Sequence, residues 1–105
     1  MSDMEFFIHH IQLDGVGEFE GYKEMGSITM SVSRDLLEDL ERIFCIGNGE
    51  GLNTVEDINL SVIYRAFAGR SLMVGDVIIV NEGVFKIARS GFELAPNLNY
   101  LKEGE

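Results

Sequence analysis

Two helical patterns follow each other directly in the middle of this sequence, and strand-like segments flank them on both sides. The first pattern runs from Ser33, a residue type that caps helix N-termini, to the glycine-rich segment 47–49. The second runs from Thr54, which has capping-box spacing to Asp57, as far as Gly69. Because no strand lies between the helices, the chain lacks the strand–helix–strand crossover that is typical of a parallel sheet.

Each helical pattern contains an apolar stripe, which predicts the face that packs on the rest of the fold. In the first helix the stripe consists of Leu36, Leu37, Leu40, Ile43 and Phe44. In the second it consists of Val55, Ile58, Val62, Ile63, Ala66 and Phe67. Four charged residues lie off the first stripe and are expected to face water: Glu38, Asp39, Glu41 and Arg42.

The flanking segments have the alternation and composition of strands. Residues 6–13 and 28–32 predict two strands before the helices. Residues 72–74, 77–80 and 84–89 predict short strands after them, and the turn at 81–83 indicates an antiparallel hairpin. One more extended piece is expected at residues 91–96. A mobile acidic loop is expected at about residues 15–25, and a polar tail at about residues 97–105.

The resulting order, β-β-α-α-β-β, predicts an α+β fold in a single domain, residues 1–105. In this fold a small antiparallel sheet carries both helices on one side. A half-open small β-barrel with two helices is the alternative arrangement. Neither a linker nor an internal repeat divides the chain, and either a monomer or a homodimer fits a core of this size.

Charge is distributed very unevenly along the chain. The formal net charge is −10, from 18 acidic and 8 basic residues. Residues 1–57 hold 13 acids and 3 bases, whereas residues 58–105 hold 5 of each, so the whole excess comes from the first half. A strongly acidic chain is not expected to bind naked nucleic acid or an anionic membrane, since both require cationic surface. With a single cysteine and no signal-peptide pattern, a cytoplasmic location is expected.

The acidic residues of the first half are the main candidates for binding a partner. They gather in the glycine-rich loop and on the outer face of the first helix: Glu18, Glu20, Glu24, Glu38, Asp39 and Glu41. Duplex DNA carries about one negative charge per 1.7 Å of its axis. Carboxylates on one continuous face would imitate part of that charge for a protein with a basic surface. The alternative is that these residues only keep a small protein in solution.

Residue types that perform chemistry are few. His9 and His10 are adjacent in a predicted strand, so their rings point to opposite faces and do not chelate one metal ion. Cys45 lies near the end of the first helix, where the helix dipole disfavours a thiolate. The segment 47–51 is glycine-rich but follows a helix and lacks the Lys-Ser/Thr of a phosphate-binding loop. The sequence therefore predicts neither an enzyme, nor a metal site, nor a bound cofactor.

The densest group of polar and glycine residues follows the second helix. Gly75 permits a tight turn, Asp76 has the residue type that accepts backbone N–H groups in such a turn, and Arg70 is close enough in sequence to pair with it. One interpretation is a structural corner that joins the helix to the hairpin. The other is a small polar pocket formed by Arg70, Ser71 and Asp76, with Arg89 from the facing strand.

The same region resembles a known family. Residues 69–78 (Gly-Arg-Ser-Leu-Met-Val-Gly-Asp-Val-Ile), followed by Phe85 and the Gly-Phe pair at 91–92, are similar to the YodL-like domain. Residues 40–48 resemble small phage proteins that carry the same C-terminal block. The similarity covers about residues 36–96, and Met73 departs from it by replacing a small polar residue. The resemblance implies residence on phages, plasmids and conjugative elements, and it implies no known reaction.

Two functions are consistent with these observations. The first is a non-enzymatic interaction protein of a phage or mobile element. It would bind, and inhibit, a host protein with a basic surface that handles nucleic acid, such as a defence or transcription factor. The alternative is a small module that binds nucleic acid or a ligand through the cations of the second half: Arg65, Arg70, Lys86 and Arg89. The alternative requires those four cations to share one face.

Overall fold

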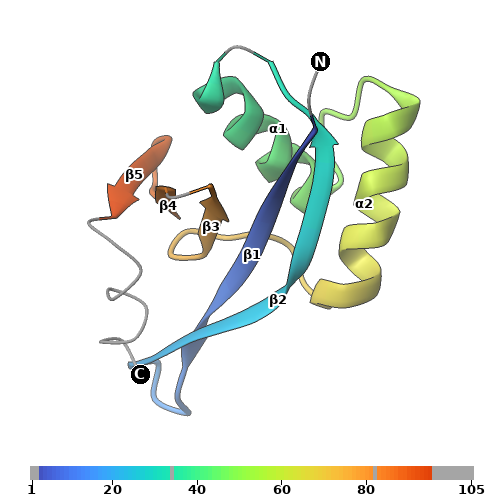
Figure 1. Cartoon of the computed structure of the whole chain (residues 1–105). Coiled ribbons are helices and arrows are strands. Elements are labelled where there is room, and N and C mark those ends of the chain that lie inside the picture. Colours follow the sequence, from blue (N-terminus) through green and yellow to red (C-terminus); the bar gives the residue numbers. More distant parts are fainter. Residues whose placement is uncertain (1–2, 34, 82, 96–105) are drawn as a thin grey trace.

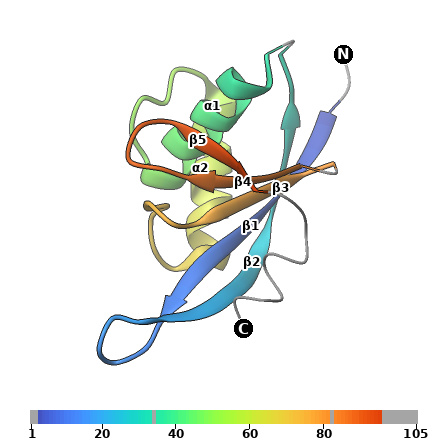
Figure 2. The ribbon, with the colours of Figure 1, turned by 90° about the vertical axis from the view of Figure 1, so that its left-hand side faces the viewer.

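Seven elements make up the chain in the computed structural model, which describes residues 3–33, 35–81 and 83–95. They are β1 (Asp3–Leu13), β2 (Phe19–Ser31), α1 (Leu36–Asn48), α2 (Val55–Ala68), β3 (Val77–Val80), β4 (Gly83–Ile87) and β5 (Phe92–Ala95). The strands form one antiparallel sheet in the order β2-β1-β3-β4-β5, and both helices lie on the same side of it (Figures 1 and 2). The predicted α+β class is confirmed, and the sheet is open rather than closed into a barrel.

Cross-strand register brings the apolar residues of three neighbouring strands, β2, β1 and β3, onto the helix side of the sheet. Phe6 of β1 pairs with Ile28 of β2 and with Val80 of β3, and Ile8 pairs with Ile78. All five side chains are buried, and they join one core with residues of both helices. The helices contribute six residues to that core: Leu40, Ile43 and Ile46 of α1, and Leu60, Tyr64 and Ala68 of α2.

Side-chain and glycine caps define both helices. Asp35, not Ser33, caps α1, because its carboxylate accepts a hydrogen bond from the Leu37 N–H, 2.9 Å away. Thr54 caps α2 as predicted, accepting from the Asp57 N–H at 3.1 Å. Gly49 and Gly69 end the helices in the left-handed region with φ of 70° and 77°, where a side chain would be strained.

Arg42 ties α1 to α2 and to the end of β2. Its Nε donates to Asp57 Oδ1 at 2.7 Å, its Nη1 donates to the Ser31 carbonyl at 2.8 Å, and its Nη2 contacts Glu56. Asp57 is buried, so the guanidinium compensates a carboxylate that water does not reach. The hydrogen bond from Arg42 lowers the pKa of Glu56. The expectation that Arg42 simply faces water is therefore wrong.

Three expectations about local structure are also corrected. Residues 19–25 belong to β2, so the predicted acidic loop is reduced to the turn that joins β1 to β2. Residues 72–74 form no strand, because they lie in the connection between α2 and β3. The predicted apolar stripe of α2 is mostly exposed, while Leu60 and Tyr64 form its buried face. The predicted polar tail at 97–105 lies outside the described residues.

No helix within the described ranges is long and apolar enough to cross a membrane.

Candidate functional site

The carboxylate of Asp76 is the most heavily hydrogen-bonded side chain in the corner between α2 and β3. It is fully buried, and Arg70 binds both of its oxygens, with Nη1–Oδ2 and Nη2–Oδ1 distances of 2.7 and 2.8 Å. The backbone N–H groups of Ile11 and Met73 donate to Oδ1 and Oδ2, each at 2.9 Å. The predicted pairing of Arg70 with Asp76 is therefore found, and hydrogen bonding to Asp76 raises the pKa of Arg70.

The polar contacts of the corner continue into the core through Tyr64. Its hydroxyl donates to the Arg70 carbonyl at 2.8 Å and lies 2.8 Å from Nε2 of His10. Tyr64 and His10 are both buried, so β1, α2 and the following loop are joined by one polar network. The sequence analysis missed Tyr64, because 54 residues separate it from His10.

This geometry favours the structural interpretation of the corner. Four donors already occupy the two oxygens of Asp76, so the carboxylate has little capacity left for a ligand. Ser71 is exposed, and its carbonyl accepts from Arg70 Nη1. Arg89 has no hydrogen bond to this network among the described residues and lines the cleft between α1 and the β4–β5 hairpin instead. Of the four residues predicted to form a polar pocket, the structure joins Arg70 and Asp76 by their side chains.

The turn between β1 and β2 forms the tip of an arm. β1 pairs with β3 from Phe6 to His9, whereas its pairing with β2 continues to Leu13 and Phe19. We call residues 12–24 the hairpin arm. Asp14 organises the tip by accepting from the N–H groups of Val16 and Glu18 at 2.8 and 2.9 Å. Figures 1 and 2 show the arm extending from the sheet, away from α1.

Three of the predicted partner-binding carboxylates lie on this arm. Glu18, Glu20 and Glu24 are all exposed. Among the described residues, one of these three carboxylates forms an ion pair: Glu24 Oε1 lies 3.8 Å from Nε2 of His9. Burial lowers the pKa of His9, although Glu24 opposes this, so the imidazole does little to neutralise the arm at neutral pH. The arm carries four acids and one base, Lys23.

Apolar side chains accompany these carboxylates, and sequence reasoning did not identify them as functional. Leu13, Val16 and Phe19 are exposed, Val16 to 82%. The rings of Phe19 and Tyr22 contact each other edge to face, with centroids 5.2 Å apart. An exposed aromatic and aliphatic cluster surrounded by charge is typical of protein–protein interfaces. The sequence does contain a signal for this apolar group, because apolar residues are interspersed among the glycines of residues 13–22.

The remaining predicted carboxylates belong to α1. Glu38 and Glu41 are exposed on it, but the expectation that Asp39 faces water is wrong. Asp39 is 4% exposed, because its Oδ1 accepts from the Ser33 N–H at 3.0 Å and holds the chain that enters the helix. In both views α1 and the arm lie at opposite ends of the molecule (Figures 1 and 2). The acidic residues therefore form two separate groups rather than one continuous face.

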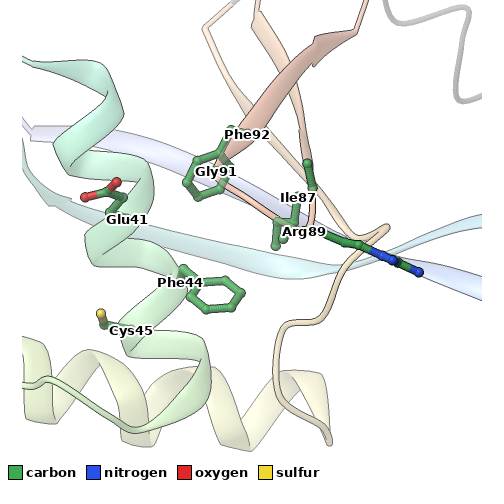
Figure 3. Close-up of a pocket in the computed structure, with 8 residues that line it drawn as sticks. Glu41, Phe44, Cys45, Ile87, Arg89, Gly91 and Phe92 are labelled. Atoms are coloured by element: carbon green, nitrogen blue, oxygen red, sulfur yellow. The ribbon is translucent and has the colours of Figure 1, made fainter.

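A cleft of about 340 Å³ lies between α1 and the β4–β5 hairpin. Its walls are formed by Phe44, Ile87 and Phe92, while Glu41 and Arg89 lie at its margin. In Figure 3 the ring of Phe44 points from α1 toward the hairpin, and the Arg89 side chain extends away from the helix. The walls are mainly apolar, and the cleft brings together no set of groups that would perform acid–base or nucleophilic chemistry.

The cations of the second half do not form a common surface. Phe85 packs against the core, so the next residue of β4, Lys86, points to the sheet face opposite the helices. Arg65 lies on α2, Arg70 binds Asp76, and Arg89 lies at the cleft. Among the described residues, no group of three or more His, Cys, Asp or Glu side chains is arranged to hold a metal ion.

No protein-family model, curated protein or solved structure matches this chain. The similarity of about residues 36–96 to the YodL-like domain stays a prediction.

Proposed function

We propose that this chain is a non-enzymatic interaction protein that binds a basic protein surface through the hairpin arm. The single observation that carries the proposal is the composition of the arm, in which the exposed carboxylates of Glu18, Glu20 and Glu24 accompany the exposed apolar side chains of Leu13, Val16 and Phe19. Compared with the sequence-based hypothesis, the arm replaces the continuous acidic face, and the carboxylates of α1 lie outside the proposed contact.

The two kinds of side chain on the arm have different roles in this proposal. Carboxylates that are not neutralised attract a basic surface and speed the encounter, an effect that salt screens over about 8–10 Å. Leu13, Val16 and Phe19 then enter an apolar depression on the partner, where desolvation supplies most of the affinity. A hairpin whose strands are paired out to Leu13 and Phe19 loses less backbone entropy on binding than an unpaired loop, which favours the complex.

Proteins that handle nucleic acid are the proposed partner class, because they carry basic surfaces that bind phosphates. A carboxylate-bearing arm competes with phosphates for such a surface and thereby inhibits nucleic-acid binding. The origin of the chain from a phage or mobile element, and the choice of a host defence or transcription factor as target, rest on the resemblance to the YodL-like domain. The cytoplasm of the host cell is the corresponding location.

Capture of host proteins from a lysate tests the proposal when two charge-matched variants are compared. Glu18→Gln/Glu20→Gln alters the arm, and Glu38→Gln/Glu41→Gln alters α1, so both change the net charge from −10 to −8. We expect the arm variant to lose capture by at least about tenfold, while the α1 variant retains it. Captured protein should be released by raised salt and by duplex DNA. Equal losses in both variants, or capture that is indifferent to salt, would contradict the proposal.

A further inference from the structure

Three carboxylates are buried among the described residues, and one of them has no cation beside it. Asp57 is paired with Arg42, and Asp76 is paired with Arg70. Asp39 is 4% exposed, yet no ion pair joins it to another described residue. A buried charge is costly unless a partner compensates it. Asp39 therefore differs from the other two in lacking the counter-ion that burial favours.

The chain itself uses one of the two carboxylate oxygens of Asp39. Oδ1 accepts a hydrogen bond from the Ser33 N–H at 3.0 Å, whereas Oδ2 accepts none from a described residue. Among the described residues, no enclosed side-chain oxygen lacks a hydrogen bond, so Oδ2 is accessible rather than sealed in the core. Asp39 also lies in the first turn of α1, where the helix dipole stabilises a negative charge. One oxygen of an anionic group is thus available to a donor from outside the chain.

A cavity of about 310 Å³ lies beside Asp39, between the N-terminus of α1 and the ends of β1, β3 and β4. Asp39 is its one charged lining residue among those described, and four of the others are apolar: Met4, Leu36, Val80 and Phe85. The Phe85 ring lies against Gly83, where a Cβ would come within 2.5 Å of Cε2. Sites for small molecules are mostly apolar cavities of about 300–1,000 Å³ with a few polar groups, so this cavity matches a small ligand.

We propose that this cavity binds a small organic amine, whose ammonium group pairs with Asp39 and whose carbon chain lies along the apolar wall. An ammonium fits better than a guanidinium, because a guanidinium binds both oxygens of a carboxylate and Oδ1 already accepts from Ser33. A metal ion requires more oxygen ligands, and the described residues gather no group of three or more that would hold one. The cavity lies at the α1 end of the molecule, opposite the hairpin arm, so this inference does not depend on the function proposed for the arm (Figures 1 and 2).

Binding of n-hexylamine to the full chain, measured by NMR, tests the proposal. At pH 7 the amine is titrated as its chloride salt, and it replaces sodium chloride so that the ionic strength stays constant. We expect saturable shifts of the backbone signals of Asp39, Val80 and Gly83. 1-Hexanol has the same chain without the charge and should bind at least about tenfold more weakly. Equal affinity for the alcohol, or shifts that do not saturate and are spread over exposed carboxylates, would overturn the proposal.

Two variants with the same change in net charge separate the carboxylate in the cavity from its exposed neighbour. Asp39→Asn keeps an oxygen for the Ser33 N–H and removes the charge, whereas Glu38→Gln removes a charge from the exposed surface of α1. Each changes the net charge from −10 to −9. We expect Asp39→Asn to weaken the binding of hexylamine by at least about tenfold and Glu38→Gln to retain it. Equal binding by the two variants would overturn the proposal. Circular dichroism checks that Asp39→Asn is folded, and the comparison of amine with alcohol on the wild type is decisive without it.

A lysine side chain of another protein carries the same ammonium group, and a second ligand distinguishes it from a free amine. Nα-acetyl-lysine methylamide presents that group on a peptide backbone. We expect it to bind more weakly than hexylamine, because its polar peptide groups would have to leave water for a small cavity with mainly apolar walls. Tighter binding of the lysine derivative would overturn the assignment of the cavity to a free amine.

Discussion

Nε2 of His10 lies 2.8 Å from the hydroxyl oxygen of Tyr64, inside the core. The single proton of that hydroxyl is donated to the Arg70 carbonyl, also at 2.8 Å. Tyr64 must therefore accept from His10, and the hydrogen-bond network assigns the neutral imidazole as the Nε2–H tautomer. Burial raises the pKa of Tyr64 well above its ordinary value, so the hydroxyl keeps its proton at neutral pH.

Tyr64→Phe should destabilise the fold by about 1–3 kcal/mol, because it leaves the His10 N–H and the Arg70 carbonyl without their partner. Urea unfolding measures the loss. In the double variant Tyr64→Phe/His10→Leu the unpaired imidazole is removed as well, so the cost should be smaller than the sum of the two single costs. Strict additivity would show that the two side chains are not coupled.

Stability should fall as the pH is lowered from 7.5 to 5.5. Burial lowers the pKa of His10 below 6.5; the charge of Asp76 opposes this shift and the charge of Arg70 adds to it. Burial also lowers the pKa of His9, although the charge of Glu24 opposes that shift. Below pH 6.5 the unfolded chain therefore binds more protons than the folded chain, and the free energy of unfolding decreases. Each histidine contributes at most about 1.4 kcal/mol per pH unit.

His10→Gln separates this effect from the titration of carboxylates. The variant should have a shallower dependence of the unfolding free energy on pH between 6.5 and 5.5 than the wild type, whatever its stability at pH 7.5. Urea titrations at four or more pH values give the two slopes. Parallel slopes would contradict the assignment of the buried neutral imidazole.

Asp76→Asn should cost about 3–5 kcal/mol, because Arg70 loses its counter-ion and an amide N–H₂ faces a donor where an oxygen accepted before. The matched control is Glu93→Gln, which removes the same charge from an exposed residue of β5 and should change stability by less than about 0.5 kcal/mol. The comparison is made by urea unfolding. Similar midpoints for the two variants would show that the corner does not stabilise the fold.

Local signals in the sequence predicted much of this fold. Thr54 and Gly69 mark the ends of α2 through side-chain capping and left-handed backbone, both of which depend on neighbouring residues only. The Arg70–Asp76 pair was predictable for the same reason, since six residues separate its members. The contact of Tyr64 with His10 spans 54 residues and depends on how α2 packs on β1, which no short window of sequence encodes.

The wrong predictions for the buried face of α2 and for Asp39 have a common physical origin. The periodicity of a helix identifies its apolar stripe, but it does not show which face the rest of the fold covers. α2 is apolar around most of its circumference, and Leu60 with Tyr64, rather than Val55 with Val62, faces the sheet. Its spacing predicts that Asp39 faces solvent, yet Asp39 is buried and accepts a hydrogen bond from the Ser33 N–H. The glycines at 15, 17 and 21 favour a loop over residues 15–25, whereas residues 19–25 belong to β2, which pairs with β1.

Gly47→Ala decides between helix propensity and packing in α1. Alanine is favoured over glycine by about 0.5–1 kcal/mol in the middle of a helix, and this preference is an upper limit for Gly47, which lies in the last turn of α1. However, a Cβ at this position would lie 2.5 Å from Cδ1 and 2.7 Å from Cγ of Leu72, a buried residue of the core. Overpacking of this kind costs about 1–3 kcal/mol, so we expect packing to prevail and the variant to be less stable than the wild type in urea. The added methyl group should be tolerated better when Leu72→Ala creates space for it, making the double variant more stable than additivity requires. If Gly47→Ala were instead more stable than the wild type, Leu72 and the connection between α2 and β3 would have moved to accommodate the added methyl group. Close packing of Leu72 on α1 would then not limit stability.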